Sequence, residues 1–409
     1  MSNRQIRCGL ALLLLPLGGC AVLTRPKALF RVHHPAAVNS GYHDYAGVIH
    51  VHTTYSHDAD GTFEDVVRVA NAQGLHFVIT TEHNNLQALR DGLQGWHGNV
   101  LILVGMEIST KSGHYVAMNV TEEVDRLNLT AQQVIDEVNR QGGLGFIAHP
   151  YFKKARWSNW SVTGFTGIEG YNVAHDTLDE NKPRLALWTL TAPVEPFFYS
   201  ILDRPYDPLS TWDHLISLHG RVVGIGASDA HEFHALGLRF APYEVMFLMS
   251  RTHLLIPSET LTPELIYDAL RAGHAYFSIE LVAEAEGFVF EARKDQTLAG
   301  IMGDEVSLSP DLRLAVSVPT AARLVLFKDG TPIAQITGQT WDVPVTEPGV
   351  YRLEASRQNK PWIFSNPIYV RPAPEVPKPV TEPPVPPAET VPADSAVPAP
   401  SDVPAAAPQ

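Results

Sequence analysis

Residues 48–61, VIHVHTTYSHDADG, decide how the rest of this chain is organised. Apolar residues lead into His50 and His52, which indicates a buried strand that ends in polar side chains. Because side chains alternate across a strand, these two histidines point the same way. Two imidazoles side by side at a strand end form half of a transition-metal site. One such pair is equally consistent with two satisfied core histidines, so the rest of the chain has to decide.

Composition narrows the class of protein. With 409 residues the chain is long enough for one large domain, or for one large and one small domain. Its net charge of -14 argues against a nucleic-acid partner, because phosphate binding requires clustered lysine and arginine. Eighteen histidines against two cysteines favour a site of imidazoles and carboxylates over a thiolate site.

The first 20 residues predict a secretory signal peptide, with a basic start, an apolar centre and small residues at the end. The final LGGC resembles the lipobox of bacterial lipoproteins, in which the cysteine, here Cys20, is acylated and becomes the first mature residue. The alternative is an ordinary cleaved signal peptide in which Cys20 is incidental. Acyl chains would hold the protein on a lipid bilayer. Since Val22 is not the aspartate of an inner-membrane retention signal, we expect a periplasm-facing protein on the outer membrane.

The pattern of apolar runs divides the remainder of the chain. Buried strands that alternate with helices indicate a parallel sheet that closes into an α/β barrel. Short alternating strands with an Asp-Gly hairpin signal at 329–330 indicate a small β-sandwich. A tail rich in proline and alanine, without aromatic residues, predicts disorder. The expected parts are the signal peptide 1–20, a tether 21–43, the barrel 44–281, the β-sandwich 282–371 and the tail 372–409.

Helix signals support the barrel. Thr62 and Asp65 have capping-box spacing before an apolar face that ends near Gly74. Further helices are expected over 130–140 and 212–218. Thr262 followed by proline at the first helical position predicts another helix, which ends before Gly273.

Polar residues fall at the ends of the predicted strands. In a parallel barrel all carboxyl ends of strands open onto one face, so these side chains should meet there. Burying so many ionisable groups together is costly unless cations compensate them, which predicts a metal cluster. The residues concerned are His50, His52, Glu82, His83, Glu107, His114, His149, Asp229 and His231.

The ordered motifs HVHTTYSHDADG, TTEHN, GMEIS, GHYV, AHP and SDAH resemble those of the polymerase and histidinol phosphatase (PHP) superfamily, over about residues 44–281. The resemblance implies a distorted seven-stranded (β/α) barrel of the TIM-like kind with two or three divalent metals, usually zinc, manganese or iron. The β-sandwich resembles a module appended to some secreted members, and one branch of the superfamily resembles carbaryl hydrolases.

The resemblance also implies the roles of residues. His57 occupies a position where many members have aspartate, so either His57 or Asp58 could be the ligand there. Asp58 and Glu82 are otherwise expected to support the ligands from behind. Glu107 and Asp229 match positions that bridge or share metals. The implied ligands are His50, His52, His57, His83, Glu107, His114, His149, Asp229 and His231, with Glu107, Asp229 and His231 as catalytic residues.

These expectations favour a metal-dependent hydrolase that acts on a small-molecule substrate, above all a phosphoesterase using a metal-activated hydroxide. Two alternatives stay open: a hydrolase of amides, carbamates or other esters, and a non-catalytic lipoprotein that binds an envelope ligand. Substrate contacts are weakly indicated. Tyr171, Asn172 and His175 follow a strand onto the same rim, the basic residues Lys153, Lys154 and Arg156 suit a solvated loop better than a phosphate site, and Arg204 and His274 have no pattern of their own.

Overall fold

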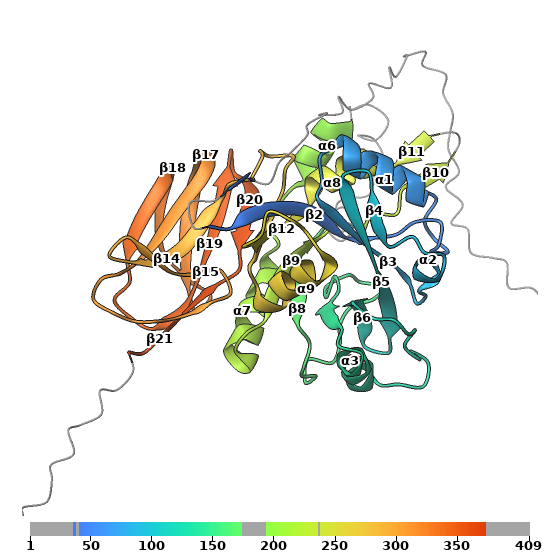
Figure 1. The fold of residues 1–409 in the computed structure, drawn as a ribbon, viewed down its shortest axis with the longest axis horizontal. Helices are drawn as coiled ribbons and strands as arrows, with labels where there is room; N and C mark the ends of the chain where they lie inside the picture. Colours follow the sequence, from blue (N-terminus) through green and yellow to red (C-terminus); the bar gives the residue numbers. More distant parts are fainter. Residues whose placement is uncertain (1–35, 38–40, 174–193, 236–237, 374–409) are drawn as a thin grey trace, which may run out of the picture. The chain divides into compact units, whose positions relative to one another are not determined.

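The computed structural model describes residues 36–37, 41–173, 194–235 and 238–373 (Figure 1). The predicted signal peptide with Cys20, most of the predicted tether, His175 and nearly all of the predicted tail lie outside the described residues. No helix within the described ranges combines the length and the apolar character needed to cross a membrane.

Seven strands form the barrel sheet and confirm the predicted α/β barrel. Six of them run parallel in the order β2, β3, β5, β7, β8 and β9, and β6 lies antiparallel between β5 and β7. A parallel bridge between Val51 and Ala230 joins the end of β2 to the segment that follows β9. The carboxyl ends of the parallel strands therefore meet at one rim. The strands are β2 His43–Val51, β3 Phe77–His83, β5 Val100–Thr110, β6 Gly113–Met118, β7 Leu144–Ile147, β8 Gly167–Asn172 and β9 Val223–Ala227.

The reversed strand β6 corrects the expectation of an all-parallel barrel. Only two residues separate β5 from β6, which is enough for a hairpin but not for a parallel crossover. The reversal places the first residues of β6, rather than its last ones, at the rim. His114 therefore reaches the rim from the start of its strand.

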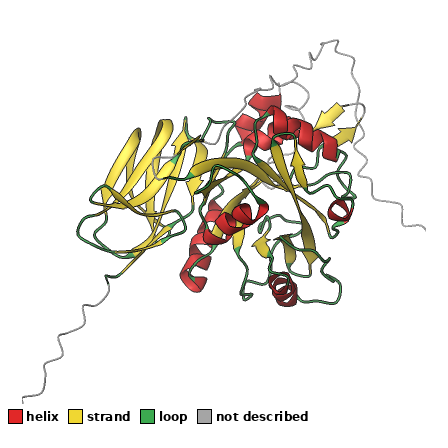
Figure 2. Cartoon of the chain, viewed as in Figure 1, coloured by secondary structure: helices red, strands yellow, loops and turns green. Residues whose placement is uncertain are grey.

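The predicted helices form (Figure 2), and two of them have the predicted caps. Thr62 and Asp65 make a complete capping box at α1, and Thr262 caps α9, which Gly273 ends with a φ of +77°. The helices are α1 Phe63–Ala72, α2 Gln87–Arg90, α3 Ala131–Arg140, α6 Val194–Ile201, α7 Tyr206–His219, α8 Tyr243–Met249 and α9 Pro263–Ala272.

Alternate residues of the barrel strands face two different apolar clusters, as the strand repeat requires. Val48, Val78 and Ile102 pack in one cluster with Val66 of α1. Ile49, Ile79 and Leu103 belong to the other cluster, which includes α9. Apolar side chains therefore pack on both faces of the barrel sheet that carries the rim.

The C-terminal part of the described residues is a β-rich domain with its own apolar core (Figure 1). Asp329 and Gly330, with φ values of +50° and +76°, form the predicted two-residue hairpin between β17 and β18. The pairing of β17 shifts between Ser317 and Ala322, so the two halves of this strand pair with β14 and β19 respectively. Its strands are β14 Val289–Lys294, β15 Thr297–Ile301, β16 Glu305–Ser307, β17 Leu312–Lys328, β18 Thr331–Pro344, β19 Gly349–Arg357, β20 Lys360–Ser365 and β21 Ile368–Arg371.

Two further strands join the barrel to the β-rich domain. Strand β12 pairs antiparallel with β2, β13 pairs with β12, and β13 pairs in turn with β20. The side chain of Asn366 donates to the carbonyls of Gly224 and Ala275 and so ties the β-rich domain to the barrel strands. One hydrogen-bonded sheet therefore runs through both. The joining strands are β12 Arg251–Ile256 and β13 Ala275–Ser278; short strands are β1 Ala36–Ala37, β4 Gly95–His97, β10 Phe233–Ala235 and β11 Leu238–Phe240.

Candidate metal centre

Glu107 lies at the centre of the rim. Its Oε1 is 2.6 Å from Nδ1 of His114 and 2.8 Å from Nε2 of His149. Its Oε2 is 2.9 Å from Nδ1 of His83 and 3.4 Å from Nε2 of both histidines of the H-x-H pair. One buried carboxylate is thus surrounded by five imidazoles from four segments of the chain.

Asp229 forms the other side of the group. Its Oδ1 lies 3.5 Å from Nε2 of His50, 3.5 Å from Nε2 of His52 and 3.6 Å from Nδ1 of His231. Eight of the nine residues predicted as ligands therefore come together at the rim. We call these eight residues the rim cluster: His50, His52, His83, Glu107, His114, His149, Asp229 and His231.

The backbone at the rim is strained. His50, His149 and Asp229 have φ values of +66°, +22° and +50°, in a region that residues other than glycine rarely adopt. Such conformations cost about 1–3 kcal/mol each and persist where the surrounding structure imposes them, commonly at functional sites. These backbone conformations direct the three side chains toward the centre of the cluster.

The ninth predicted ligand, His57, does not join the cluster. Its side chain is 80% exposed, and its Nε2 comes within only 3.9 Å of Asp58. The carboxylate of Asp58 instead lies 3.2 Å from Nε2 of His83 and 3.8 Å from Nε2 of His231. Of the two neighbouring residues that the sequence left open as the ligand, the structure places Asp58, and not His57, against histidines of the rim cluster.

Several buried nitrogen and oxygen atoms at the centre lack a hydrogen bond to the described residues. Nε2 of His50, Nε2 of His52 and Oε2 of Glu107 make none with any residue that the structure describes. Leaving such atoms buried and unpaired costs about 1–3 kcal/mol each, and more for charged groups. Imidazole nitrogens and carboxylate oxygens that converge within 4.8 Å of one another are a donor set that suits divalent transition metals, so these residues fit the implied cations.

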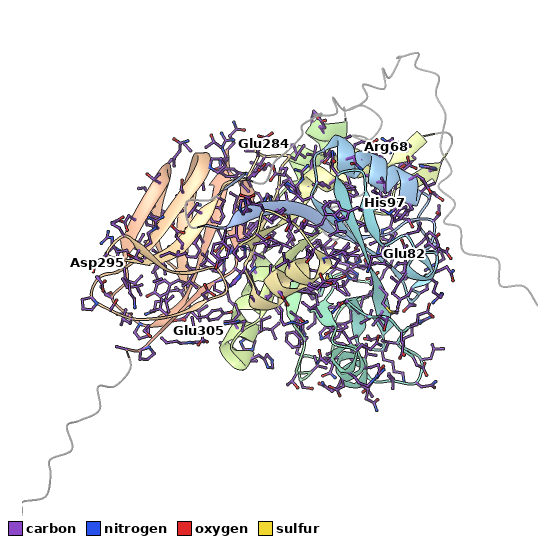
Figure 3. The ribbon with its side chains drawn as sticks, in the orientation of Figure 1. Arg68, Glu82, His97, Glu284, Asp295 and Glu305 are labelled. Carbon is purple, nitrogen blue, oxygen red and sulfur yellow. The ribbon has the colours of Figure 1, made fainter. Side chains whose placement is uncertain are left out.

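Two supporting carboxylates determine which ring nitrogens face inward. Glu169 lies 2.5 Å from Nδ1 of His50, so this nitrogen donates outward and Nε2 presents its lone pair to the centre. Ser56 donates to Glu82 at 2.6 Å and therefore accepts from Nδ1 of His52 at 3.1 Å, with the same result for His52. Glu82, on strand β3 (Figure 3), thus lies behind the rim as expected.

Glu169 was missed by sequence reasoning. It also accepts from the backbone N–H of His149 at 2.6 Å and from the amide of Asn172 at 2.8 Å. The available signal was a carboxylate inside an otherwise buried strand, GIEGYN, because a buried charge requires a partner.

The electrostatics of the cluster are those of tightly paired opposite charges. Burial, followed by the nearby His231, lowers the pKa of His52 to about 3. Burial opposes protonation of His83, but Asp58 and Glu107 outweigh it and raise the pKa of His83 to about 10. Burial opposes ionisation of Asp58, yet His83 brings the pKa of Asp58 down to about 2.

The weaker candidates fall in three groups. Asn172 lies 3.3 Å from Oδ2 of Asp229 and touches the centre. Lys153 and Lys154 are exposed, as expected for a solvated loop. Arg204 and His274 each pair with a carboxylate of the β-rich domain, Glu354 and Asp304 respectively.

Known proteins resemble parts of this chain. Residues 49–193 match the model of the PHP domain. An uncharacterised protein from Methanocaldococcus jannaschii is 26% identical over 143 residues, which span 31% of this chain and 81% of the relative. A crystal structure from Bacteroides vulgatus, described as a two-domain protein containing a predicted PHP-like metal-dependent phosphoesterase, aligns with a TM-score of 0.40 and 15% identity over 82% of this chain and 99% of that chain.

Proposed function

Because the barrel of this chain belongs to the PHP superfamily, we propose that the protein is a metal-dependent hydrolase and that its substrates are phosphoesters. The observation that carries the proposal is the convergence of five imidazoles on the buried carboxylate of Glu107. A structural core would pair these atoms with one another, whereas several of them lack partners among the described residues.

The cluster offers three neighbouring positions for two or three cations such as zinc, manganese or iron. Glu107 belongs to two of the positions and so couples them. Divalent cations bound there would supply water activation near neutral pH and neutralisation of the charge that develops on substrate oxygens. The first position would be formed by His50, His52, Glu107 and Asp229, the second by Glu107, His114 and His149, and the third by Asp58, His83 and His231.

The residues of the chain orient this centre. Nδ1 of His231 donates to the backbone carbonyl of Asp229 at 2.9 Å, which keeps the proton on Nδ1 and leaves Nε2 free to face Asp58. Asn172 donates to Oδ2 of Asp229 at 3.3 Å and so leaves Oδ1 directed at the imidazoles. We assign Glu107, Asp229 and His231 as the catalytic residues on these grounds.

The first test is hydrolysis by the chain without residues 1–20, loaded with zinc or manganese, against 4-nitrophenyl phosphate, bis(4-nitrophenyl) phosphate and an aryl carbamate. Chelator-sensitive cleavage of a phosphate ester is the expected result and also decides between monoester and diester. Cleavage of the carbamate alone would replace the phosphoesterase by the alternative hydrolase. A protein that binds metal and cleaves none of the three would contradict the proposal and favour a binding protein.

We also propose that acylated Cys20 anchors the protein on the periplasmic side of the outer membrane. The support is the LGGC sequence that ends at Cys20 and the residue Val22 two positions later. Replacing the nucleophilic thiol, Cys20→Ser, is expected to abolish labelling by a palmitate analogue and to release the protein from the membrane fraction. Unchanged labelling and fractionation would refute the anchor.

A further inference from the structure

A cavity of about 220 Å³ adjoins the metal centre. At its inner end lie His149, Glu169 and Asn172, which contact the centre directly. Its outer wall is the loop over residues 203–208, where α7 begins. A group attached to a substrate held at the centre would therefore enter this cavity.

The walls of the cavity are mainly rings. They comprise the tyrosines Tyr151, Tyr171 and Tyr206 and the prolines Pro150, Pro205 and Pro208. The rest of the lining is polar: His149, Asn172, Arg204 and the carboxylates of Glu169, Asp203 and Asp207. Small-molecule sites combine aromatic and apolar walls with a few polar groups that fix the orientation of a ligand. The lining therefore suits a planar ring.

Arg204 is the basic residue of the cavity lining. Its Nε and Nη2 donate to the two carboxylate oxygens of Glu354, each at 2.6 Å. Its guanidinium also lies 4.7 Å from the centre of the ring of Tyr206. Nη1 donates no hydrogen bond to any residue in the described ranges, so it is available to an acceptor on a ligand.

Glu354 belongs to the β-rich domain, on strand β19, and is itself held in place. Arg352, 2% exposed, donates to Glu354 at 2.5 Å and makes a bidentate pair with Asp213 of α7 at 2.6 Å. Bidentate pairs between arginine and carboxylate define orientation as well as contact. The β-rich domain therefore sets the direction in which Arg204 points.

The cavity continues outward. A groove of about 1210 Å³ between α7 and strands of the β-rich domain shares Asp203, Arg204, Tyr206 and Asp207 with it. Tyr206 is 68% exposed at this junction. Substituents on a ring held in the cavity would thus extend into a space bounded by both parts of the molecule.

We propose that Arg204 determines substrate specificity by binding a hydrogen-bond acceptor on a planar ring in the non-reacting part of the substrate, and that Glu354 is the positioning residue that orients Arg204. The inference rests on the proposed function, because it places the reacting ester at the metal centre. It gives the β-rich domain a part in substrate selection.

The experiment measures binding rather than turnover. The zinc-loaded chain without residues 1–20 is titrated by calorimetry with 4-nitrophenylphosphonate and with methylphosphonate, which share the charged group but differ in the ring. We expect the wild type to bind the aryl compound at least tenfold more tightly. Arg204→Ala and Glu354→Gln should reduce this preference to threefold or less while the affinity for methylphosphonate stays within twofold.

Asp304→Asn is the matched control. It weakens the pair with His274, another contact between barrel and β-rich domain, but touches no wall of the cavity. The control should keep the preference for the aryl compound, with all variants compared by circular dichroism and thermal melting. The inference is overturned if the wild type shows no preference, if Arg204→Ala retains it, or if Asp304→Asn loses it equally.

Hydrolysis and binding separate the two proposals. An aryl preference that depends on Arg204, in a protein that cleaves no ester, would refute the hydrolase but support the cavity as a recognition site. Ester cleavage without that preference would support the hydrolase and refute the role of Arg204.

Discussion

Two buried polar clusters in this molecule have similar residues and opposite properties. The rim cluster collects histidines and carboxylates, and several of its inward-facing atoms have no hydrogen bond among the described residues. A second cluster lies where β12 and β13 join the barrel to the β-rich domain. We call it the joint cluster: Asp44, His253, Tyr276, Ser278 and Glu280.

The polar atoms of the joint cluster are paired with one another and with the neighbouring backbone of Ala285 and Gly287. Nδ1 of His253 donates to Asp44 at 2.8 Å, and its Nε2 lies 3.0 Å from the hydroxyl of Ser278. That hydroxyl donates to Glu280 at 2.8 Å, so it accepts from Nε2 and His253 is an imidazolium. Tyr276 donates to the other oxygen of Asp44. Aspartate, histidine and serine are the residue types of a catalytic triad. The complete hydrogen bonding of these side chains instead indicates a structural role.

The largest effect is expected from removing metal ligands of the rim cluster, because only this cluster should bind metal. Replacing both histidines of the H-x-H pair, His50→Ala with His52→Ala, removes two donors of the first cation position. We expect the first position to lose its cation, so that metal loading falls by about one cation per chain, and hydrolysis to fall about 1000-fold or more, with a folded chain, because cation-assisted water activation is lost. Elemental analysis and circular dichroism measure both. Full metal content in the double variant would disprove the ligand assignment.

The converse change in the joint cluster should act on stability alone. Asp44→Ala leaves His253 buried without its main partner, and breaking a buried charge pair in this way costs about 3–5 kcal/mol. Denaturant unfolding should show this loss, while metal stoichiometry at low denaturant stays unchanged. A fall in metal content at full folding would show that the two clusters are coupled.

Glu169→Gln tests support of the rim from behind. The amide cannot carry the charge that orients His50, and loss of such a partner typically lowers metal affinity about 10–100-fold. Competition with a coloured chelator measures the affinity. Glu291→Gln, which removes a buried carboxylate of the β-rich domain that pairs with Arg293, is the control and should leave it unchanged.

The smallest effect is the pH dependence of the joint cluster. Burial disfavours the imidazolium of His253, but Asp44 and Glu280 outweigh burial and raise its pKa to about 9. Since the folded pKa exceeds the unfolded value, this contribution is fully present below about pH 6.5 and is lost as the pH rises through 9. The difference in unfolding free energy between wild type and His253→Gln should therefore shrink by about 2 kcal/mol between pH 7.5 and pH 9.5. A difference that stays constant over this range would mean that His253 is not charged.

The sequence was informative about the rim where residue spacing alone decides geometry. His50 and His52 share a strand face at a separation of two, and strand ends of a parallel barrel share a rim. The sequence did not determine whether His57 or Asp58 approaches the rim cluster, because the backbone conformation of a loop decides which of two neighbouring side chains turns inward.

Glu169 and the joint cluster were missed for related reasons. The pairing of β8 with β9 shifts between Glu169 and Tyr171, so strand alternation does not predict which way Glu169 faces. The joint cluster unites residues more than 200 positions apart, such as Asp44 and Tyr276, and no local pattern connects them. The reversal of β6, in contrast, was open to prediction from its short connection to β5.

The pairing of β13 with β20 has a consequence for attempts to dissect the chain. A protein ended at residue 281 would lose β20 and leave the edge of β13 that pairs with it, over residues 276–278, without its strand partner. An exposed strand edge of this kind, flanked by apolar side chains, invites pairing with another copy and aggregation. We therefore expect the isolated barrel to be insoluble. The β-rich domain thus protects the barrel from aggregation by covering the edge of β13.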